Sequence, residues 1–151
     1  MSHDDTIDTL NDLIETSKDG EYGFRACAEN ATDPALRQTF EQRAEACRQA
    51  AAELQALVVR LGGHAEDSGS AVGAMHRGWV AVKGTLAGYT DKAVLEEAER
   101  GEDSALERYR KALEEPLPED VRQVLERQYE GVKRNHQQVR TLRDQARAMA
   151  G

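Results

Sequence analysis

The stretch GHAEDSGSAVGAMHRGWVAVKGTLAGYT, residues 63–90, decides the topology of this chain. It joins two halves that each predict a hairpin of long helices. Its polar first part is followed by apolar residues at helical spacing, which predict a shorter amphipathic helix over about residues 71–87. These apolar residues are Val72, Met75, Trp79, Val82 and Leu86. About eight extended residues and a helix of about seventeen reach on the order of 50 Å.

A connection of this reach allows the helices before and after it to be parallel. The helix before it, predicted at about 29 residues, is roughly 43 Å long, so the connection can travel the whole length of a bundle. Two short-loop hairpins joined in this way predict an all-α, ferritin-like four-helix bundle with up-down-down-up topology. We expect one domain over residues 1–151, with the crossover at about 63–90.

The predicted helices are set by apolar residues three and four positions apart and by their end signals. The first runs from about Asp5 to Asn30. The second begins at Pro34 after a capping Asp33 and stops at the Gly62-Gly63 pair. The third follows Thr90 or Asp91, and the fourth opens at Pro118 after the helix-breaking EEPLPED segment.

The composition excludes several classes of function. Hydrophobic residues make up 39% and charged residues 32% of the chain, and the formal net charge is −8. The acidic balance argues against nucleic acid as a partner. No apolar run reaches membrane-spanning length, and the acidic start MSHDDTIDTL lacks the features of a signal peptide. We therefore expect a cytoplasmic protein with no membrane partner, in which Cys27 and Cys47 stay reduced.

Several words of the sequence carry a family resemblance. LNDLIETSKDGEYGFR, AAELQALVVRLGG, GSAVGAMHRGW, ERGEDSALERYRKAL and VKRNHQQVRTLRD resemble a family of uncharacterised bacterial proteins in the ferritin-like superfamily. The likeness covers about Leu10 to Asp144, and HRGW and ERGED are its fairly specific words. The resemblance implies a ferritin-like bundle. It implies no activity, because that family has no settled one.

Two carboxylates interrupt the apolar stripes, Glu21 in the first helix and Glu102 in the third. In the up-down-down-up arrangement each lies about eleven residues from the end where the first hairpin turns, which is roughly 16 Å along the helix. Two dry, ionised carboxylates at one level would repel strongly. A metal ion, a cationic side chain, a shared proton or water must therefore offset them.

The metal interpretation has a defined pattern to meet. Di-iron bundles use a lone Glu from each of two helices and Glu-x-x-His from each of the other two. The lone glutamates match, but the other two helices present Ala44 with Cys47, and Val132 with Asn135. The sequence therefore favours no cofactor. Iron or zinc is kept as an alternative, with three candidate ligands: Glu21, Glu102 and His136.

The structural interpretation has a nearer partner. Arg43 is within about 40° of the second helix's stripe and level with Glu21, and a guanidinium can hold a buried carboxylate through two hydrogen bonds. The sequence thus predicts a buried polar network in place of a di-iron site. Its members are Glu21, Arg43, Glu102, Gln128 and Asn135. Glycines at the same depth favour close helix approach or room for the crossover helix, with space for a ligand as the alternative. These are Gly20, Gly23, Gly101 and Gly131.

Two other features of the sequence have an expected role. His76, Arg77 and Trp79 form a candidate interface with a partner subunit or a small ligand. Basic residues of the fourth helix, such as Arg143 and Arg147, run beside an acidic stretch of the third and predict a salt-bridge seam.

The sequence as a whole favours a non-enzymatic bundle with a structural, interaction or stress-associated role. No catalytic residue is assigned, because P-loop, nucleophile-elbow and HExxH motifs are missing from the sequence. Self-association into a homo-oligomer is expected, and the sequence names no other protein partner. The alternative is a metal-binding or redox protein that uses the mid-bundle carboxylates, and a third interpretation is a small-ligand binder.

Overall fold

The computed structural model of the chain describes residues 3–67 and 91–150. Four helices account for most of this part: α1 (His3–Asn30), α2 (Pro34–Arg60), α4 (Asp91–Leu113) and α5 (Glu119–Ala150). The described residues contain no strand. The amphipathic helix predicted over 71–87, and with it His76, Arg77 and Trp79, lies outside the described residues.

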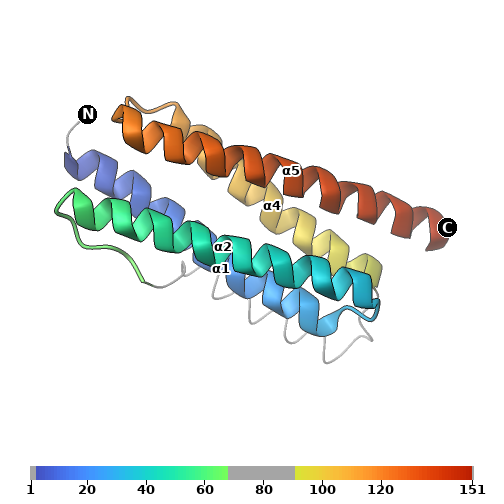
Figure 1. The fold of residues 1–151 in the computed structure, drawn as a ribbon. Helices are drawn as coiled ribbons and strands as arrows, with labels where there is room; N and C mark the ends of the chain where they lie inside the picture. The colour runs from blue at the N-terminus through green and yellow to red at the C-terminus, as the bar shows by residue number, and fades with distance from the viewer. Residues whose placement is uncertain (1–2, 68–90, 151) are drawn as a thin grey trace.

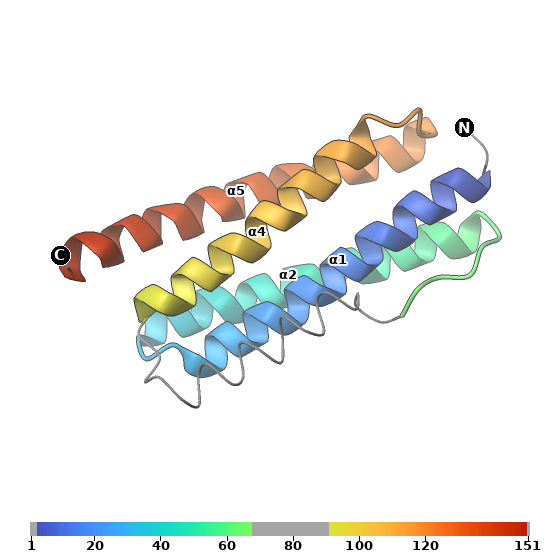
Figure 2. The same ribbon diagram turned by 180° about the vertical axis from the view of Figure 1, so that it is seen from behind.

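The helix directions confirm the predicted topology. α1 and α5 run one way and α2 and α4 the other, so the helices on either side of residues 61–90 are parallel (Figure 1). Seen from behind, α4 begins beside the turn between α1 and α2 (Figure 2). The Asp91 carboxylate fixes this junction by accepting hydrogen bonds from the Thr32 N–H at 2.7 Å, the Thr32 hydroxyl at 3.0 Å and the Asp33 N–H at 3.2 Å.

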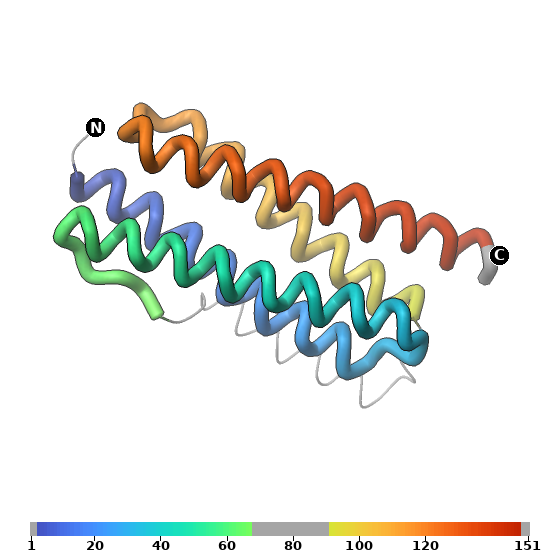
Figure 3. The backbone as a smooth tube through the Cα atoms, in the orientation of Figure 1, coloured from blue at the N-terminus to red at the C-terminus, as the bar shows by residue number. Residues whose placement is uncertain are grey.

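Short turns close the two hairpins, at residues 31–33 and 114–118 (Figure 3). The Asp33 carboxylate caps α2 by accepting from the Ala35 N–H at 3.2 Å, and Pro34 takes the first helical position, where its missing N–H costs nothing. α2 ends before Gly62, whose φ of 83° is left-handed and favours glycine. The predicted end signals of α2 are therefore the ones the structure uses.

Two apolar clusters make up the core, one toward each end of the bundle. The first includes Leu10, Ile14, Leu54, Tyr109 and Leu125. The second includes Phe24, Phe40, Ala44, Leu95 and Val139. α1 packs against both α2 and α4, and α4 packs against α5, whereas α2 and α5 approach each other at few points. This arrangement leaves the middle of the bundle less filled than its ends.

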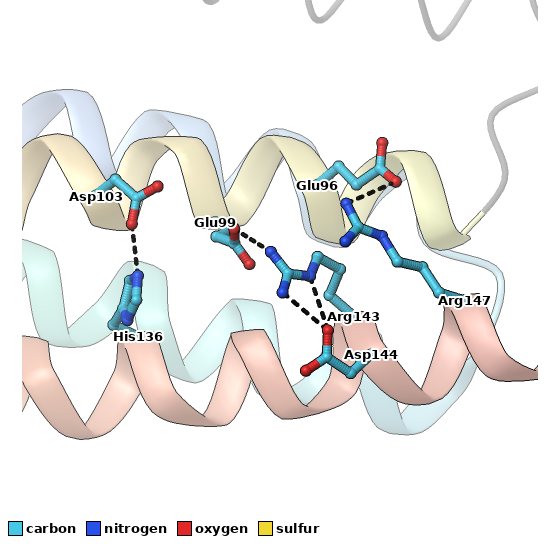
Figure 4. A network of polar contacts seen from close by, with 7 residues as sticks. All are labelled: Glu96, Glu99, Asp103, His136, Arg143, Asp144 and Arg147. Atoms are coloured by element: carbon cyan, nitrogen blue, oxygen red, sulfur yellow. Dashed lines mark hydrogen bonds and ion pairs between the residues drawn. The ribbon is translucent and has the colours of Figure 1, made fainter.

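A seam of polar contacts joins α4 to α5 toward the start of α4 (Figure 4). Arg143 donates to Glu99, Arg147 lies 3.5 Å from Glu96, and His136 Nε2 lies 2.5 Å from Asp103 Oδ1. The salt-bridge seam predicted from the charge pattern is therefore present.

Candidate functional site

A cleft of about 960 Å³ lies at mid-bundle. Each of the four described helices contributes to its wall, which contains residues of both core clusters. Its lining includes Gly23 from α1, Arg43 and Cys47 from α2, Glu102 from α4, and Gln128 and Asn135 from α5. Four of the five residues of the predicted polar network therefore line one cavity.

Glu102 is the buried acid of this cleft. Its residue surface is only 4% exposed, and its Oε1 atom has no hydrogen-bond partner among the described residues. Burial raises the pKa of this carboxyl from 4.5 to about 7. The positive charge of Arg43 opposes this increase, and the negative charge of Asp103 adds to it. The side chain is therefore close to half-protonated at neutral pH.

Arg43 faces Glu102 without bonding to it. Burial lowers the pKa of the guanidinium, and the attraction of Glu102 opposes that change. The Arg43 Nε atom is buried and has no hydrogen-bond partner in the part of the chain that the structure describes. One donor and one acceptor, of opposite formal charge, are thus left unsatisfied in the same cleft.

Glu21 lies elsewhere. Its carboxylate accepts a hydrogen bond at 3.0 Å from Arg25, one turn further along α1, and it does not line the cleft. The predicted pairing of Arg43 with Glu21 is wrong: Arg43 interacts with Glu102 instead, and Glu21 pairs with Arg25. The physical reason is that an (i, i+4) partner reaches a helical carboxylate without crossing the bundle.

A chain of hydrogen bonds crosses the cleft and ties three helices together. The Tyr109 hydroxyl donates to Gln128 Oε1 at 2.7 Å, and Gln128 Nε2 donates to Glu53 Oε1 at 2.7 Å. Arg127 donates to the other oxygen of Glu53. A hydrogen bond with Ser17 of α1 partly offsets the burial that raises the pKa of the Tyr109 hydroxyl.

The sequence pattern indicates Gln128 but not the rest of this chain of hydrogen bonds. Tyr109 stands at apolar spacing in α4, yet a buried tyrosine hydroxyl usually finds a hydrogen-bond partner. This requirement for a hydrogen-bond partner is the feature of the sequence that indicates a polar role for Tyr109. The sequence signal for Glu53 is weaker: this residue lies next to Leu54, on the flank of the apolar face of α2.

Most glycines of the cleft have no neighbouring atom close to the position that a Cβ atom would occupy. A Cβ atom added at Gly23 or Gly101 would meet no atom within 4 Å, and one added at Gly131 would meet only Arg134 Nη2, at 3.7 Å. At Gly20 the added Cβ would lie 2.9 Å from Cys47 Sγ. Close helix approach, the first explanation from sequence, fits Gly20. No atom is closer than 3.7 Å to an added Cβ at Gly23, Gly101 or Gly131, and the crossover helix, the other part of that explanation, lies outside the described residues.

The side chains of the cleft do not fit a di-iron centre. Among the described residues, no three His, Cys, Asp or Glu side chains form a group that could hold a metal ion. His136 pairs with Asp103 on the α4–α5 seam, and Glu21 pairs with Arg25. Burial raises the pKa of both the Cys27 and the Cys47 thiol to about 12, which disfavours the thiolate that binds metals.

Comparison with known proteins identifies the family. The model of a domain of unknown function, DUF2383, matches residues 5–115. This chain belongs to the DUF2383 family. No curated protein matches the sequence of this DUF2383 protein. None of the described helices is long and apolar enough to cross a membrane.

Solved structures place the DUF2383 protein in the ferritin-like fold. A mutant of Dps1 from Mycobacterium smegmatis has a TM-score of 0.75 at 18% identity, covering 95% of this chain and 99% of that chain. A dodecameric thioferritin, the bacterioferritin-related protein of Bacteroides fragilis, has a TM-score of 0.77 at 16% identity, covering 99% and 91%. A conserved hypothetical protein from Mycobacterium tuberculosis has a TM-score of 0.74 at 12% identity, covering 94% and 99%. At these identities the likeness concerns the fold alone.

Proposed function

We propose that this DUF2383 protein is a non-enzymatic ferritin-like bundle with a structural or interaction role, in which a polar network replaces the di-iron centre. The observation that carries the proposal is the hydrogen-bonded chain from Tyr109 through Gln128 to Glu53 and Arg127. It lines the mid-bundle cleft, between helices that di-iron bundles use to hold their metals.

The network supports this function because Glu53, the carboxylate of the hydrogen-bonded chain, is already engaged. Glu53 accepts hydrogen bonds from both Arg127 and Gln128, and Glu21 is paired with Arg25. Ligation of a metal ion would require these charge-assisted bonds to break. The hydrogen bonds from Tyr109 to Gln128 and from Gln128 to Glu53 also favour one helix register over others, which is a structural role.

The alternative function, a metal-binding or redox protein, rests on one observation. Glu102 keeps an unpartnered buried oxygen near the thiol of Cys47, whose pKa its charge helps to raise. A carboxylate can bind iron or zinc, and a single ion held partly by water would need few protein ligands.

Metal analysis separates the two functions. The protein is purified without chelator, and iron and zinc per chain are measured for the wild type and for the double variant Glu21→Gln/Glu102→Gln. We expect far less than one ion per chain in both. Stoichiometric metal in the wild type that disappears in the double variant would establish the metal-binding alternative.

We also propose that the bundle self-associates through its outer helix faces. Closed symmetric homo-oligomers are the commonest assemblies of soluble proteins, and the structurally similar thioferritin is dodecameric. Val59 is a hydrophobic side chain that is 65% exposed. Sedimentation velocity should give a mass above that of one chain, reduced by Val59→Glu. A monomer across the micromolar range would contradict self-association.

A further inference from the structure

We propose that the mid-bundle cleft binds a small zwitterionic molecule with an apolar body, whose ammonium group pairs with Glu102 and whose carboxylate pairs with Arg43. This inference goes beyond the structural role proposed above and requires no metal. It rests on three features of the described residues: the space in the cleft, the two unsatisfied polar groups, and the walls around them.

The space in the cleft is maintained at a cost. Glycine inside a helix is less favourable than alanine by about 1 kcal/mol. Nothing among the described residues forces glycine at Gly23 or Gly101, because an added Cβ would meet no atom within 4 Å. The volume of about 960 Å³ falls within the range of roughly 300–1,000 Å³ that is typical of small-molecule sites.

The unsatisfied groups define the polar end of the ligand. Glu102 is 4% exposed with Oε1 unpartnered, and Arg43 has its buried Nε–H unpartnered. Buried polar groups left without a partner cost free energy, and charged ones cost more. The two side chains attract each other but form no ion pair within 4.0 Å, so each keeps bonding capacity for a ligand group.

The opposite charges of the pair select a zwitterion over a simple ion. An amine would satisfy Glu102 and leave the Arg43 donor unmet, whereas a carboxylic acid would satisfy Arg43 and leave Glu102 unmet. A ligand that carries both charges satisfies both groups and leaves the net charge of the cleft unchanged. The carboxylate–guanidinium contact is also one for which arginine geometry is well suited.

The rest of the wall is part charged and part apolar, and its apolar part suits the body of the ligand. Phe24, Ala98 and Val132 line the cleft with apolar side chains, and Ala50 and Ala105 add small ones. Small-molecule sites combine such walls with a few well-placed polar groups. The matching chemistry is that of an apolar α-amino acid or a molecule of similar form.

Calorimetric titration of the full-length wild-type protein with three probes tests the proposal. L-Phenylalanine carries both charges, phenethylamine carries only the amine, and hydrocinnamate carries only the carboxylate. We expect L-phenylalanine to bind at least tenfold more tightly than either of the others. No measurable binding of L-phenylalanine, or equal or tighter binding of a single-charge probe, would overturn the proposal.

Variants then assign the contacts. Glu102→Gln should weaken L-phenylalanine and phenethylamine at least tenfold and leave hydrocinnamate unchanged, and Arg43→Met should do the reverse for the two single-charge probes. Glu21→Gln is the matched control, because it removes the same charge outside the cleft. Gly23→Leu should abolish binding of all three probes by filling the open space. Equal losses in Glu21→Gln and Glu102→Gln would show that the cleft is not the site. Circular dichroism confirms that each variant is folded. The metal content of the protein does not depend on any of these binding results, so the metal analysis above tests the proposed function separately.

Discussion

Glu102 of α4 and Arg43 of α2 face one cleft and attract each other, yet no hydrogen bond joins them. A buried carboxyl group that lacks a bonded cation is shifted toward its neutral form, because burial disfavours the charge more than the unbonded guanidinium favours it. The protonation of Glu102 therefore bears directly on the middle of the bundle.

The stability of the protein should therefore depend on pH through Glu102. Its pKa rises from 4.5 to about 7 on folding, chiefly through burial and despite Arg43. The stabilisation is fully present below about pH 4.5 and is lost as the pH rises through 7, because the folded state then holds an unfavourable buried charge. The loss amounts to roughly 3 kcal/mol. Glu102→Gln should remove it, so urea denaturation should find the variant more stable than the wild type at pH 8 and nearly equal to it at pH 4.5.

The control for this pH dependence is Glu21→Gln, whose carboxylate is paired with Arg25. It removes a carboxyl group outside the cleft, so it should not reproduce the gain in stability that Glu102→Gln gives at pH 8. Parallel profiles for Glu102→Gln and the wild type would instead show that Glu102 does not titrate near neutral pH.

Tyr109→Phe should destabilise the bundle by about 1–3 kcal/mol. The change removes the hydroxyl that donates to Gln128 Oε1 at 2.7 Å and leaves that buried oxygen without its partner. Tyr129→Phe is the matched control, since Tyr129 stacks on Tyr109 through its ring, with centroids 6.5 Å apart, and keeps that contact as phenylalanine. Chemical denaturation measures both. Equal effects of the two substitutions would contradict a structural role for the hydroxyl.

Alanine at two neighbouring glycines of α1 should act in opposite directions. Gly23→Ala should stabilise the protein by about 0.5–1 kcal/mol, because the new methyl group meets no neighbour and the helix gains propensity. Gly20→Ala should destabilise it, because the methyl group would lie 2.9 Å from Cys47 Sγ, which is too close. Thermal unfolding of the two variants compares them directly. Stabilisation by both would show that Cys47 moves aside freely.

On the α4–α5 seam, Arg143→Ala should lower the free energy of unfolding more than Arg147→Ala does. The side chains of Arg143 and Glu99 are 12% and 18% exposed, so their bond lies in a drier setting, and its loss should lower the free energy of unfolding by more than the loss of an exposed ion pair. The Arg147–Glu96 pair is 49% and 39% exposed at 3.5 Å, and its loss should cost less than about 1 kcal/mol. Urea denaturation in low and high salt should show the smaller effect fading with salt. Similar losses for both variants would argue against a buried seam.

The fold was predictable because its signals are local or geometric. Asp33, Pro34 and Gly62 mark the ends of α2 through backbone chemistry that tertiary packing did not override. The length of the connection from residue 63 to 90 sufficed to allow parallel α2 and α4, and the charge pattern sufficed for the seam between α4 and α5. These inferences need only the rise per residue and the helical repeat.

The site was predictable only in part, because its partners depend on side-chain reach. Glu102 and Gln128 point inward as their stripes predict, and both are buried. Glu21 occupies an equivalent stripe position, yet Arg25 on its own helix captures it. The partners of Tyr109 and the open space beside Gly23 and Gly101 depend on how far α2 lies from α5, which no spacing within one helix reveals.

The central claim is that polar side chains, rather than a metal pair, occupy the middle of this DUF2383 bundle. Its most direct test is anomalous diffraction at the iron edge from crystals soaked anaerobically in Fe²⁺. We predict no anomalous peak within coordination distance of Glu102 or Glu53, and density that keeps the hydrogen bonds from Gln128 to Glu53 and from Tyr109 to Gln128. An ordered iron peak bound to Glu102, with the Gln128 bonds broken, would contradict the claim.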